Sequence, residues 1–319
     1  MRSTLPLSFA LDADPHSGTA LMNEGIDFPS YSLPVAQRLV VHGFDTTKQT
    51  WLETENVDED VRLPALACAT FNTWFQGGEQ ELRYGGLMSV LEQSNADVIV
   101  LQEVTMQLLE ALMSANWVRD RYKFARSPFR AGAIPSHGTM LLSRLPFRNA
   151  TLHPIPTYMG RSLLTVETMI NGMKFVLATV HLESMKSNAD TRETQLIAIF
   201  KILEESQNVI LAGDFNFCSS SREENSRIDP RYIDIWAALK PNEPGFTRDT
   251  DNNHMLAKAK NDSQRVRIDR ILLRSDAQEW RPDSIQLLGT LPVSPKYPKI
   301  FPSDHFGIIS AIRPSSRVP

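Results

Sequence analysis

Short polar signatures stand at the ends of apolar runs throughout this chain. Runs such as 98–101 and 209–212 have the composition of buried strands, so the polar residues after them lie at a sheet edge, where several can meet in one cleft. The side chains gathered there are carboxylates, amides and imidazoles, without cysteine. Such ligands suit a hard divalent cation and chemistry on a phosphate ester. The signatures are Asn72, Leu101-Gln102-Glu103-Val104, His181-Leu182-Glu183-Ser184, Gly213-Asp214-Phe215-Asn216, Arg267-Ile268-Asp269-Arg270 and Ser303-Asp304-His305.

Among the six signatures, the one that begins at Gly213 gives the most specific indication of a functional site. Gly213 permits a tight turn directly after a buried strand. Asp214 is then placed to deprotonate or orient an attacking water, and Asn216 to hold that water or a phosphate oxygen. An ordinary Asp/Asn turn is the alternative interpretation, but the buried strand before it favours a functional one.

Three further polar residues close apolar strands. Glu103 could bind Mg²⁺ or Mn²⁺, Asn72 could steady a phosphate oxygen, and His181 could donate to a phosphoryl oxygen as charge builds. Each also has a structural interpretation: a solvated glutamate, a turn asparagine and a half-buried histidine. Taken alone, each structural interpretation is preferable. Six signatures in this order favour one shared site instead.

The last two signatures predict a carboxylate–histidine pair. Asp269 lies among apolar strand residues, where a carboxylate needs a partner. His305 could be that partner, held in one tautomer and made more basic, and would be the main histidine in contact with phosphate. Asp304 could support the metal site. The alternatives are an Asp–Arg ion pair for Asp269, a structural turn residue for Asp304 and a surface side chain for His305.

The elements that must position these residues alternate between strand and helix from residue 63 to about residue 313. Asn171-Gly172 predicts a two-residue hairpin turn between strands 163–170 and 173–180. Asp190, with Glu193 three residues later, resembles a capping box and predicts a helix over 191–205. The mixture favours an α/β sandwich with sheets inside and helices outside. The other expected strands cover 66–71, 97–101, 140–142, 209–212, 268–273, 284–288 and 306–312, and the other helices 83–93 and 106–115.

Residues 1–62 differ from the rest in their prolines and weak periodicity. We expect an N-terminal extension over 1–62, with a small hairpin around residues 39–51 that could pack on the main body. Residues 63–319 carry no linker-like composition, so they are expected to form one domain.

The composition of the 319 residues, 42% hydrophobic and 22% charged, is that of a globular protein with a sizeable core. A net charge of −4 argues against coating nucleic acid by charge alone and leaves a local basic groove open. No apolar run reaches membrane-spanning length, and acidic residues interrupt the only stretch that resembles a signal peptide. Two cysteines indicate a reducing intracellular compartment, nucleus or cytoplasm. The candidate groove arginines are Arg222, Arg227, Arg231, Arg265 and Arg267.

Over roughly residues 64–313, the order of the signatures resembles the endonuclease/exonuclease/phosphatase superfamily of Mg²⁺-dependent phosphodiesterases and phosphatases. The resemblance implies a four-layered α/β sandwich, in which two packed, mixed and largely antiparallel sheets are flanked by helices. Segments 101–104, 179–184 (followed by Arg192 and Gln195), 247–253, 267–271 and 302–307 look most like the branch that hydrolyses 5′-phosphotyrosyl-DNA bonds in DNA repair. The resemblance therefore implies Mg²⁺, or Mn²⁺ in its place, as the cofactor. It also implies that the partner is DNA with a 5′-tyrosyl or protein adduct. We expect the protein to be a monomer.

The resemblance also implies roles for individual residues. By it, we expect Asp214, Asn216, His305, Asp269, His181 and Asn72 to be catalytic, Glu103, Asn72 and Asp304 to bind metal, and Ser184, Arg248, Arg267 and Asn216 to contact substrate.

Two departures from the family pattern keep alternatives open. Asn72-Thr73-Trp74 replaces the common Asn-x-Asp and looks more like sphingomyelinase or deadenylase relatives. Arg248 stands where the tyrosyl-DNA branch has tryptophan, so an aromatic platform for a base is lost there, although arginine can stack or bind phosphate. A sphingomyelinase-like, inositol-phosphate or RNA 3′-end hydrolase is the first alternative. A non-catalytic binding protein that retains the fold is the second, and the intact acidic signatures oppose it.

Overall fold

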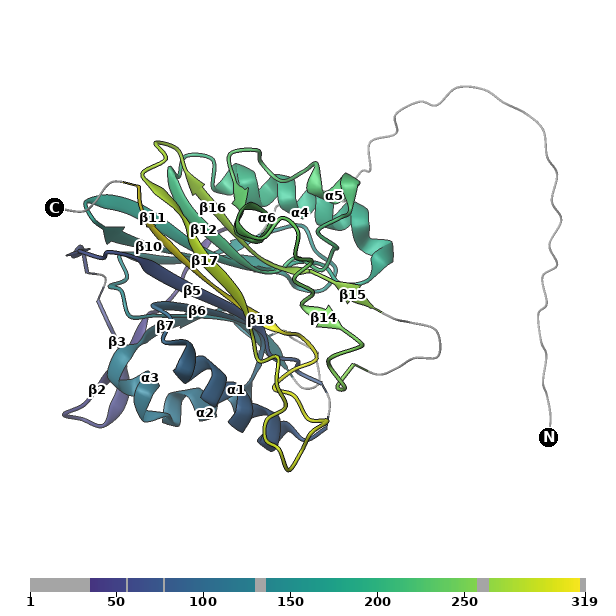
Figure 1. Cartoon of the computed structure of the whole chain (residues 1–319). Helices are drawn as coiled ribbons and strands as arrows, with labels where there is room; N and C mark the ends of the chain where they lie inside the picture. The colour runs from purple at the N-terminus through teal and green to yellow at the C-terminus, as the bar shows by residue number, and fades with distance from the viewer. Residues whose placement is uncertain (1–34, 56, 77, 130–135, 257–263, 316–319) are drawn as a thin grey trace, which may run out of the picture. The chain divides into compact units, whose positions relative to one another are not determined.

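Two β-sheets of eight strands each form the centre of the molecule (Figure 1). The computed structural model describes residues 35–55, 57–76, 78–129, 136–256 and 264–315. The inner faces of the two sheets bury one apolar core against each other, with Leu141, Leu177 and Ile271 among its members. Burial of such side chains is the main favourable contribution to folding.

The first sheet is built around a hairpin. β10 (Ser162–Ile170) and β11 (Met173–His181) pair antiparallel with Ile170 opposite Met173, as the Asn171-Gly172 turn predicted. Both turn residues have positive φ, 53° and 80°, which the two-residue turn requires. β11 runs parallel to its neighbour β12, which is antiparallel to β16. The remaining strands of this sheet are β12 (Asn208–Asp214), β16 (Asp269–Ser275), β9 (Asn149–Pro154), β1 (Gln37–Arg38), β4 (Asp60–Val61) and β13 (Ile233–Asp234).

The second sheet has the parallel pair β5 (Leu66–Asn72) and β6 (Val98–Thr105) at its centre. Its order is β17-β18-β5-β6-β8-β7-β2-β3. A separate two-stranded ribbon, β14 (Arg248–Asp249) with β15 (Arg265–Val266), belongs to neither large sheet. The remaining strands are β17 (Trp280–Leu288), β18 (Gly307–Pro314), β8 (His137–Ser143), β7 (Lys123–Arg126), β2 (His42–Asp45) and β3 (Thr50–Glu53).

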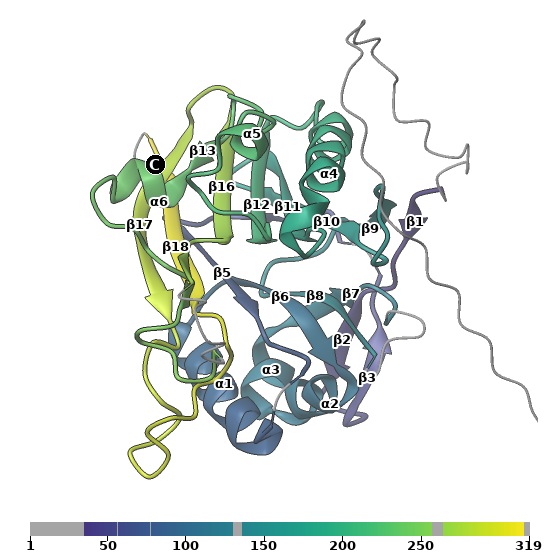
Figure 2. The ribbon, with the colours of Figure 1, turned by 90° about the vertical axis from the view of Figure 1, so that its right-hand side faces the viewer.

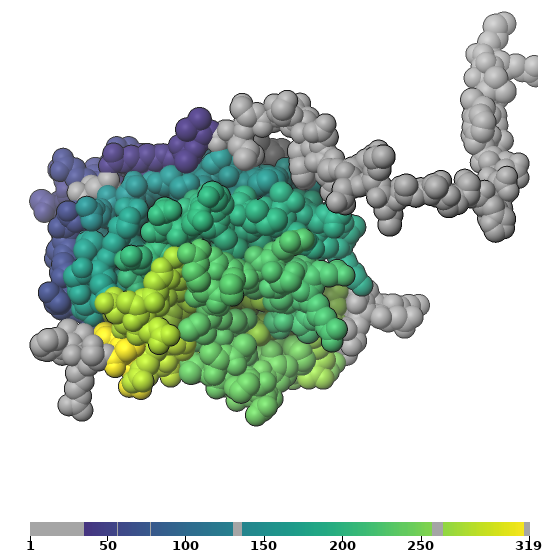
Figure 3. Space-filling view, turned by 90° about the horizontal axis from the view of Figure 1, so that it is seen from above, coloured from purple at the N-terminus to yellow at the C-terminus, as the bar shows by residue number. Residues whose placement is uncertain are grey.

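Helices cover the outer faces of the sheets (Figure 2). Apolar residues of α1, α2 and α3 pack on the second sheet, and those of α4 pack on the first. Figure 3 views the first sheet's outer side, where the surface comes mainly from the teal and green middle of the chain. The expected four-layered sandwich is confirmed. The helices are α1 (Gln80–Ser94), α2 (Met106–Ser114), α3 (Asn116–Arg121), α4 (Ala189–Ile202), α5 (Arg222–Asn225) and α6 (Ile235–Leu239).

The capping box predicted at Asp190 is wrong. A 3₁₀ turn, Lys186–Asn188, leads directly into α4, so Asn188 occupies the N-cap position and Asp190 lies inside the first helical turn. The Asn188 side chain makes no capping hydrogen bond to the helix, and its Nδ2 donates instead to the Ser184 carbonyl oxygen at 2.7 Å. The helix therefore begins earlier than expected, and it ends three residues earlier, at Ile202.

The described residues between 35 and 61 contribute strands to both sheets: β1 and β4 to the first, and β2 and β3 to the second. The division at residue 62 stays a prediction, and residues 1–34 lie outside the described residues. Within the described part of the chain, no helix is long and apolar enough to cross a membrane. Cys68 and Cys218 are free thiols.

Candidate active site

In the described part of the chain, the two sheets bring five strand ends to the same edge. β5 ends at Asn72, β11 at His181 and β12 at Asp214. β16 begins at Asp269, and because it runs antiparallel to β12, Asp269 lies opposite Asp214. In the same way, β18 begins just after His305 and pairs antiparallel with β5. Residues up to 231 positions apart therefore meet; Ser303 Oγ, for example, donates to the Asn72 carbonyl oxygen at 2.7 Å.

Glu103 reaches this edge through an irregularity in β6. The pairing of β6 with β8 shifts register between Leu101 and Val104, and Glu103 has φ of 60°. Such a bulge re-aims a side chain, and bulges are frequent beside functional sites. Glu103 Oε2 accepts from the Phe75 amide at 2.8 Å. Burial, reinforced by the charge of Asp304, raises the pKa of the Glu103 carboxyl group.

Asp214 is completely buried and linked to both sheets. Its Oδ2 accepts from Asn72 Nδ2 at 2.9 Å, and its Oδ1 accepts from the Asn216 amide at 2.8 Å. Burial, followed by repulsion from Asp269, raises the pKa of Asp214 to about 6. A carboxylate with an elevated pKa is a better proton acceptor than an ordinary aspartate.

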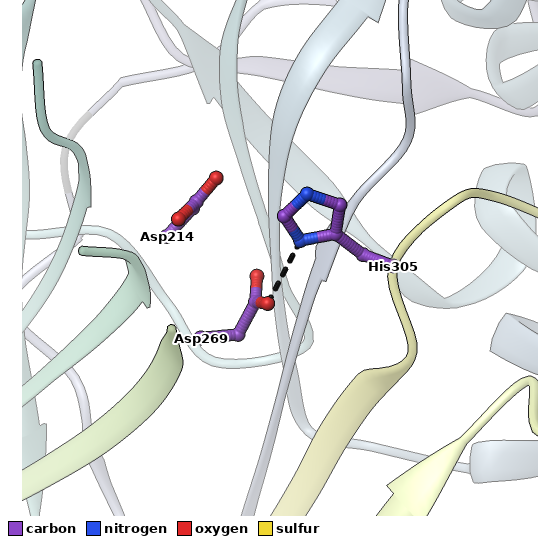
Figure 4. Close-up of side chains that lie close together, drawn as sticks. All are labelled: Asp214, Asp269 and His305. Atoms are coloured by element: carbon purple, nitrogen blue, oxygen red, sulfur yellow. Dashed lines mark hydrogen bonds and ion pairs between the residues drawn. The ribbon is translucent and has the colours of Figure 1, made fainter. Parts of the chain in front are cut away.

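His305 and Asp269 form the pair that the sequence predicted (Figure 4). His305 Nδ1 donates to Asp269 Oδ2 at 2.8 Å, and both side chains are buried. Burial alone would lower the pKa of His305, but the charges of Asp269 and Asp304 and the hydrogen bond to Asp269 raise it to about 10. The imidazole therefore carries a positive charge that can face developing negative charge.

His181 has a partner that sequence reasoning missed, Arg161. The Arg161 Nη1 lies 2.7 Å from His181 Nδ1, and Arg161 Nη2 donates to Ser184 Oγ at 2.8 Å. Arginine can only donate, so His181 Nδ1 is the acceptor and the ring proton is on Nε2. That nitrogen lies 3.5 Å from Asp214 Oδ2 and 3.8 Å from Glu103 Oε1. His181 thus presents a donor to the site.

Asn216, Ser184, Asp304 and Arg248 also lie at this edge. Asn216 Nδ2 donates to the Leu182 carbonyl at 3.0 Å and approaches Ser184 Oγ at 3.4 Å. Arg248 Nη2 donates to Asp304 Oδ2 at 3.3 Å. Together with Glu103, Asp214 and His305, these four residues line one cleft of about 780 Å³, which is large enough for a nucleotide-sized ligand.

Arg267 is the expected substrate residue that the structure places elsewhere. Its Nη1 bonds both oxygens of Asp234, at 3.0 and 2.8 Å, and its side chain is 7% exposed. β16 begins only at Asp269, so Arg267 lies before the strand that carries Asp269 to the site. Val266 and Ile268 line the cleft instead. None of the five groove arginines lines this cleft, and four of them form ion pairs: Arg227, Arg231, Arg265 and Arg267.

The donor set of the cleft fits a divalent cation. Glu103, Asp214, Asp269 and Asp304 bring negative charge together at this edge. Burial first, and then repulsion from a neighbouring carboxylate, raises the pKa of Glu103 and of Asp214. Asp269 Oδ1 is buried and has no hydrogen-bond partner among the described residues. Asp214, Asp269 and His305 offer ligand atoms within 4.8 Å of one another. Because the His305 ring donates to Asp269 and is charged, the Glu103 and Asp304 side of the cleft suits a hard cation better.

The layered sandwich and the cleft at its sheet edge define a class of protein. A comparison with models of known protein families identifies the same class. Residues 69–305 match the endonuclease/exonuclease/phosphatase family, and the chain belongs to that family.

The most informative relatives share one name. Tyrosyl-DNA phosphodiesterase 2 of Bos taurus is 30% identical over 240 residues, covering 72% of this chain and 62% of the relative. The Homo sapiens protein of that name is 31% identical over 237 residues, covering 71% and 62%. The chain thus spans less than two thirds of these relatives. The crystal structure of D. rerio TDP2 complexed with single-strand DNA product superimposes with a TM-score of 0.68 at 27% identity, covering 78% of this chain and 99% of that one.

Gly213 is expected to be irreplaceable for the local fold. It has φ of 150°, and a Cβ there would lie 2.0 Å from the Val180 carbonyl oxygen on the neighbouring strand. Gly213→Ala should lower the free energy of unfolding by about 2–4 kcal/mol, measured by urea denaturation. Gly172→Ala is the matched control: its φ is also positive, at 80°, but nothing lies within 4 Å. Equal losses in the two variants would contradict the steric explanation.

Proposed function

We propose that this protein is a Mg²⁺-dependent phosphodiesterase that hydrolyses the 5′-phosphotyrosyl bond between DNA and a protein or tyrosine adduct, as a step of DNA repair. The observation that carries the proposal is the convergence of Glu103, Asp214 and the Asp269–His305 pair at one sheet edge. The names of the relatives support the substrate. Manganese could replace magnesium, because both are hard cations with oxygen ligands.

In this proposal, the chain's own groups position water and phosphate and move one proton. Asp214, held by Asn72 and the Asn216 amide, accepts the proton of the attacking water. The new P–O bond forms in line with the bond to the tyrosine oxygen, which breaks. The tyrosine departs as its phenolate, which takes a proton from the solvent, and a 5′-phosphate remains on the DNA. The preorganised side chains of the protein orient the reacting groups and stabilise the charge that develops on the phosphate.

Donors surround the position of the phosphoryl oxygens. The charged His305, oriented by Asp269, faces the charge that develops there. His181 offers Nε2–H, because Arg161 occupies its other ring nitrogen. Asn216 and Ser184 lie beside it. Arg248, anchored on Asp304 and 29% exposed, is the cleft arginine best placed for a DNA phosphate.

Glu103 and Asp304, with Asn72 beside them, are the residues proposed to hold the cation. When bound, a divalent cation polarises the phosphoryl oxygen and neutralises charge. The Phe75 amide fixes one Glu103 oxygen, which leaves the other oxygen for a ligand. We propose that the protein acts as a monomer, since the side chains that the proposal assigns to cation, water and phosphate can all be supplied by a single chain.

The test is hydrolysis of a 5′-phosphotyrosyl oligonucleotide. We expect Mg²⁺-dependent release of tyrosine that leaves a 5′-phosphate, complete loss with EDTA, and a loss of about 10²-fold or more in Glu103→Gln, because a charged metal ligand is removed. Glu110→Gln, on the exposed face of α2, is the control and should retain full activity.

The same assay separates the alternatives. Sphingomyelin, inositol phosphates and poly(A) are tested alongside the tyrosyl substrate. Turnover of one of these without tyrosine release would replace the DNA-repair proposal by another phosphodiesterase of the same fold. A folded protein that binds Mg²⁺ and turns over none of them would favour the non-catalytic binding protein.

A further inference from the structure

Trp74 has an unusual backbone conformation beside the candidate active site. It follows Asn72 by two residues, its amide donates to Asn72 Oδ1 at 3.0 Å, and its φ is 57°. A bulky residue rarely adopts positive φ, and such outliers cluster at ligand sites. Trp74 is half-buried, and it lines the same cleft as Asp214 and His305.

A buried arginine holds this tryptophan in place. The guanidinium of Arg83 lies 4.6 Å from the centre of the Trp74 ring. Arg83 is fully buried, and its five N–H groups donate to five backbone carbonyl oxygens at 3.1–3.3 Å. Four of these carbonyls belong to the loop that carries Trp74, and the fifth belongs to Pro302, just before Asp304. The described residues of this loop are therefore held in place by contacts within the protein.

The stack gives the ring two different faces. Arg83 covers one face through a cation–π contact. Trp74 is half-buried and lines the cleft, so a planar group in the cleft would stack on the face of the ring that Arg83 does not cover. Proteins that hold single-stranded nucleic acid commonly stack bases on fixed aromatic rings, with arginine adding to the interaction.

We propose that Trp74, backed by Arg83, is the stacking platform for the nucleobase of the terminal nucleotide, the one whose 5′-phosphate is attacked. This inference rests on the proposed function for its substrate. Asn72 accepts a hydrogen bond from the Trp74 backbone amide and donates one to Asp214, so it ties the backbone that carries the platform to the residue proposed to activate water. A phosphate at Asp214 then has its own nucleoside within reach of Trp74. Every base has a planar face, so the platform selects a base-bearing strand without selecting its sequence.

The kinetic test compares two 5′-tyrosyl oligonucleotides, one with adenine at the terminal nucleotide and one abasic there. The wild-type protein should favour the adenine substrate by roughly 10- to 100-fold in kcat/KM, the size of one base–aromatic stack. Trp74→Ala should lose this preference, with kcat/KM falling on the adenine substrate and holding on the abasic one. Trp74→Phe should retain most of it. Equal losses on both substrates would overturn the proposal and assign Trp74 a purely structural role.

The tyrosyl ring of the leaving group is the competing occupant. A third substrate, the adenine strand with an alkyl alcohol in place of tyrosine, distinguishes the nucleobase from the tyrosyl ring as the group that stacks on Trp74. If Trp74→Ala impairs the abasic tyrosyl substrate and spares the alkyl ester, the ring belongs to the leaving group and the nucleobase proposal is wrong.

A binding measurement separates the inference from catalysis. Titration with a 5′-phosphorylated oligonucleotide should quench tryptophan fluorescence in the wild type and in the matched control Trp51→Phe, which alters β3 outside the cleft. The quench should vanish in Trp74→Phe. Quenching without any turnover of tyrosyl substrates would reject the proposed function and keep the platform. Turnover with an unchanged quench in Trp74→Phe would reject the platform alone.

Discussion

Asp214→Asn should reduce kcat by about 10²–10⁴-fold, the usual contribution of a general base. Asparagine has nearly the same shape, and its amide oxygen can keep one of the two hydrogen bonds that Asp214 accepts, from Asn72 or from the Asn216 amide, but it cannot take a proton from water. The fold should survive. Asp214 and Asp269 repel each other in a buried place, so removal of one charge should leave the midpoint of thermal unfolding unchanged or raise it.

The measurement is kcat on the 5′-phosphotyrosyl oligonucleotide together with thermal unfolding of the same samples. Asp190→Asn, on the exposed first turn of α4, is the matched control and should behave as the wild type. Retained turnover in Asp214→Asn would exclude Asp214 as the proton acceptor. A large fall in the unfolding midpoint would instead mean that the loss of activity reflects the fold.

His305→Gln should reduce kcat by about 10²–10³-fold, because one charged donor to the phosphoryl group is removed. Asp269→Asn should reduce kcat less, since His305 remains but loses the carboxylate that orients and charges it. Because the two residues act as a unit, the double variant should be no worse than His305→Gln alone.

The double-mutant cycle is measured as kcat/KM for the wild type, the two single variants and the double variant. His254→Gln, which changes an exposed histidine that does not line the cleft, is the matched control. Losses that multiply in the double variant would mean that Asp269 and His305 contribute independently, and the paired mechanism would then be wrong.

Local signals in the sequence were sufficient for elements whose cause is local. The Asn171-Gly172 turn requires two positive φ angles, and both are present where the turn was expected. The apolar runs before Asn72, Glu103 and Asp214 are strands for the same kind of reason, since such runs need burial on both faces. Asp190 failed as a cap, because a 3₁₀ turn preceding the helix moved its start, which a capping pattern does not encode.

Long-range contacts explain what the sequence missed. Arg161 lies outside the sequence motifs. Its role in the site comes from hydrogen bonds to His181 and Ser184, which are 20 and 23 residues away. Nothing near Arg161 in the sequence marks it. Arg83 is similar: its position in α1 suggests a surface arginine, yet it is buried against five carbonyl oxygens. Arg267 was expected to contact substrate because of the resemblance, but its contact with Asp234, 33 residues away, holds it elsewhere.

The sequence by itself determined which types of side chain the site contains, the order of the strand ends that carry them and the layered fold. Residue type and hydrophobic period are local properties of the chain. Tertiary structure alone decided which atoms meet. The antiparallel register of β12 and β16 sets Asp214 opposite Asp269, and the irregular pairing of β6 lets Glu103 reach the cleft. Register and packing between sheets depend on contacts across the whole chain, so no single segment contains them.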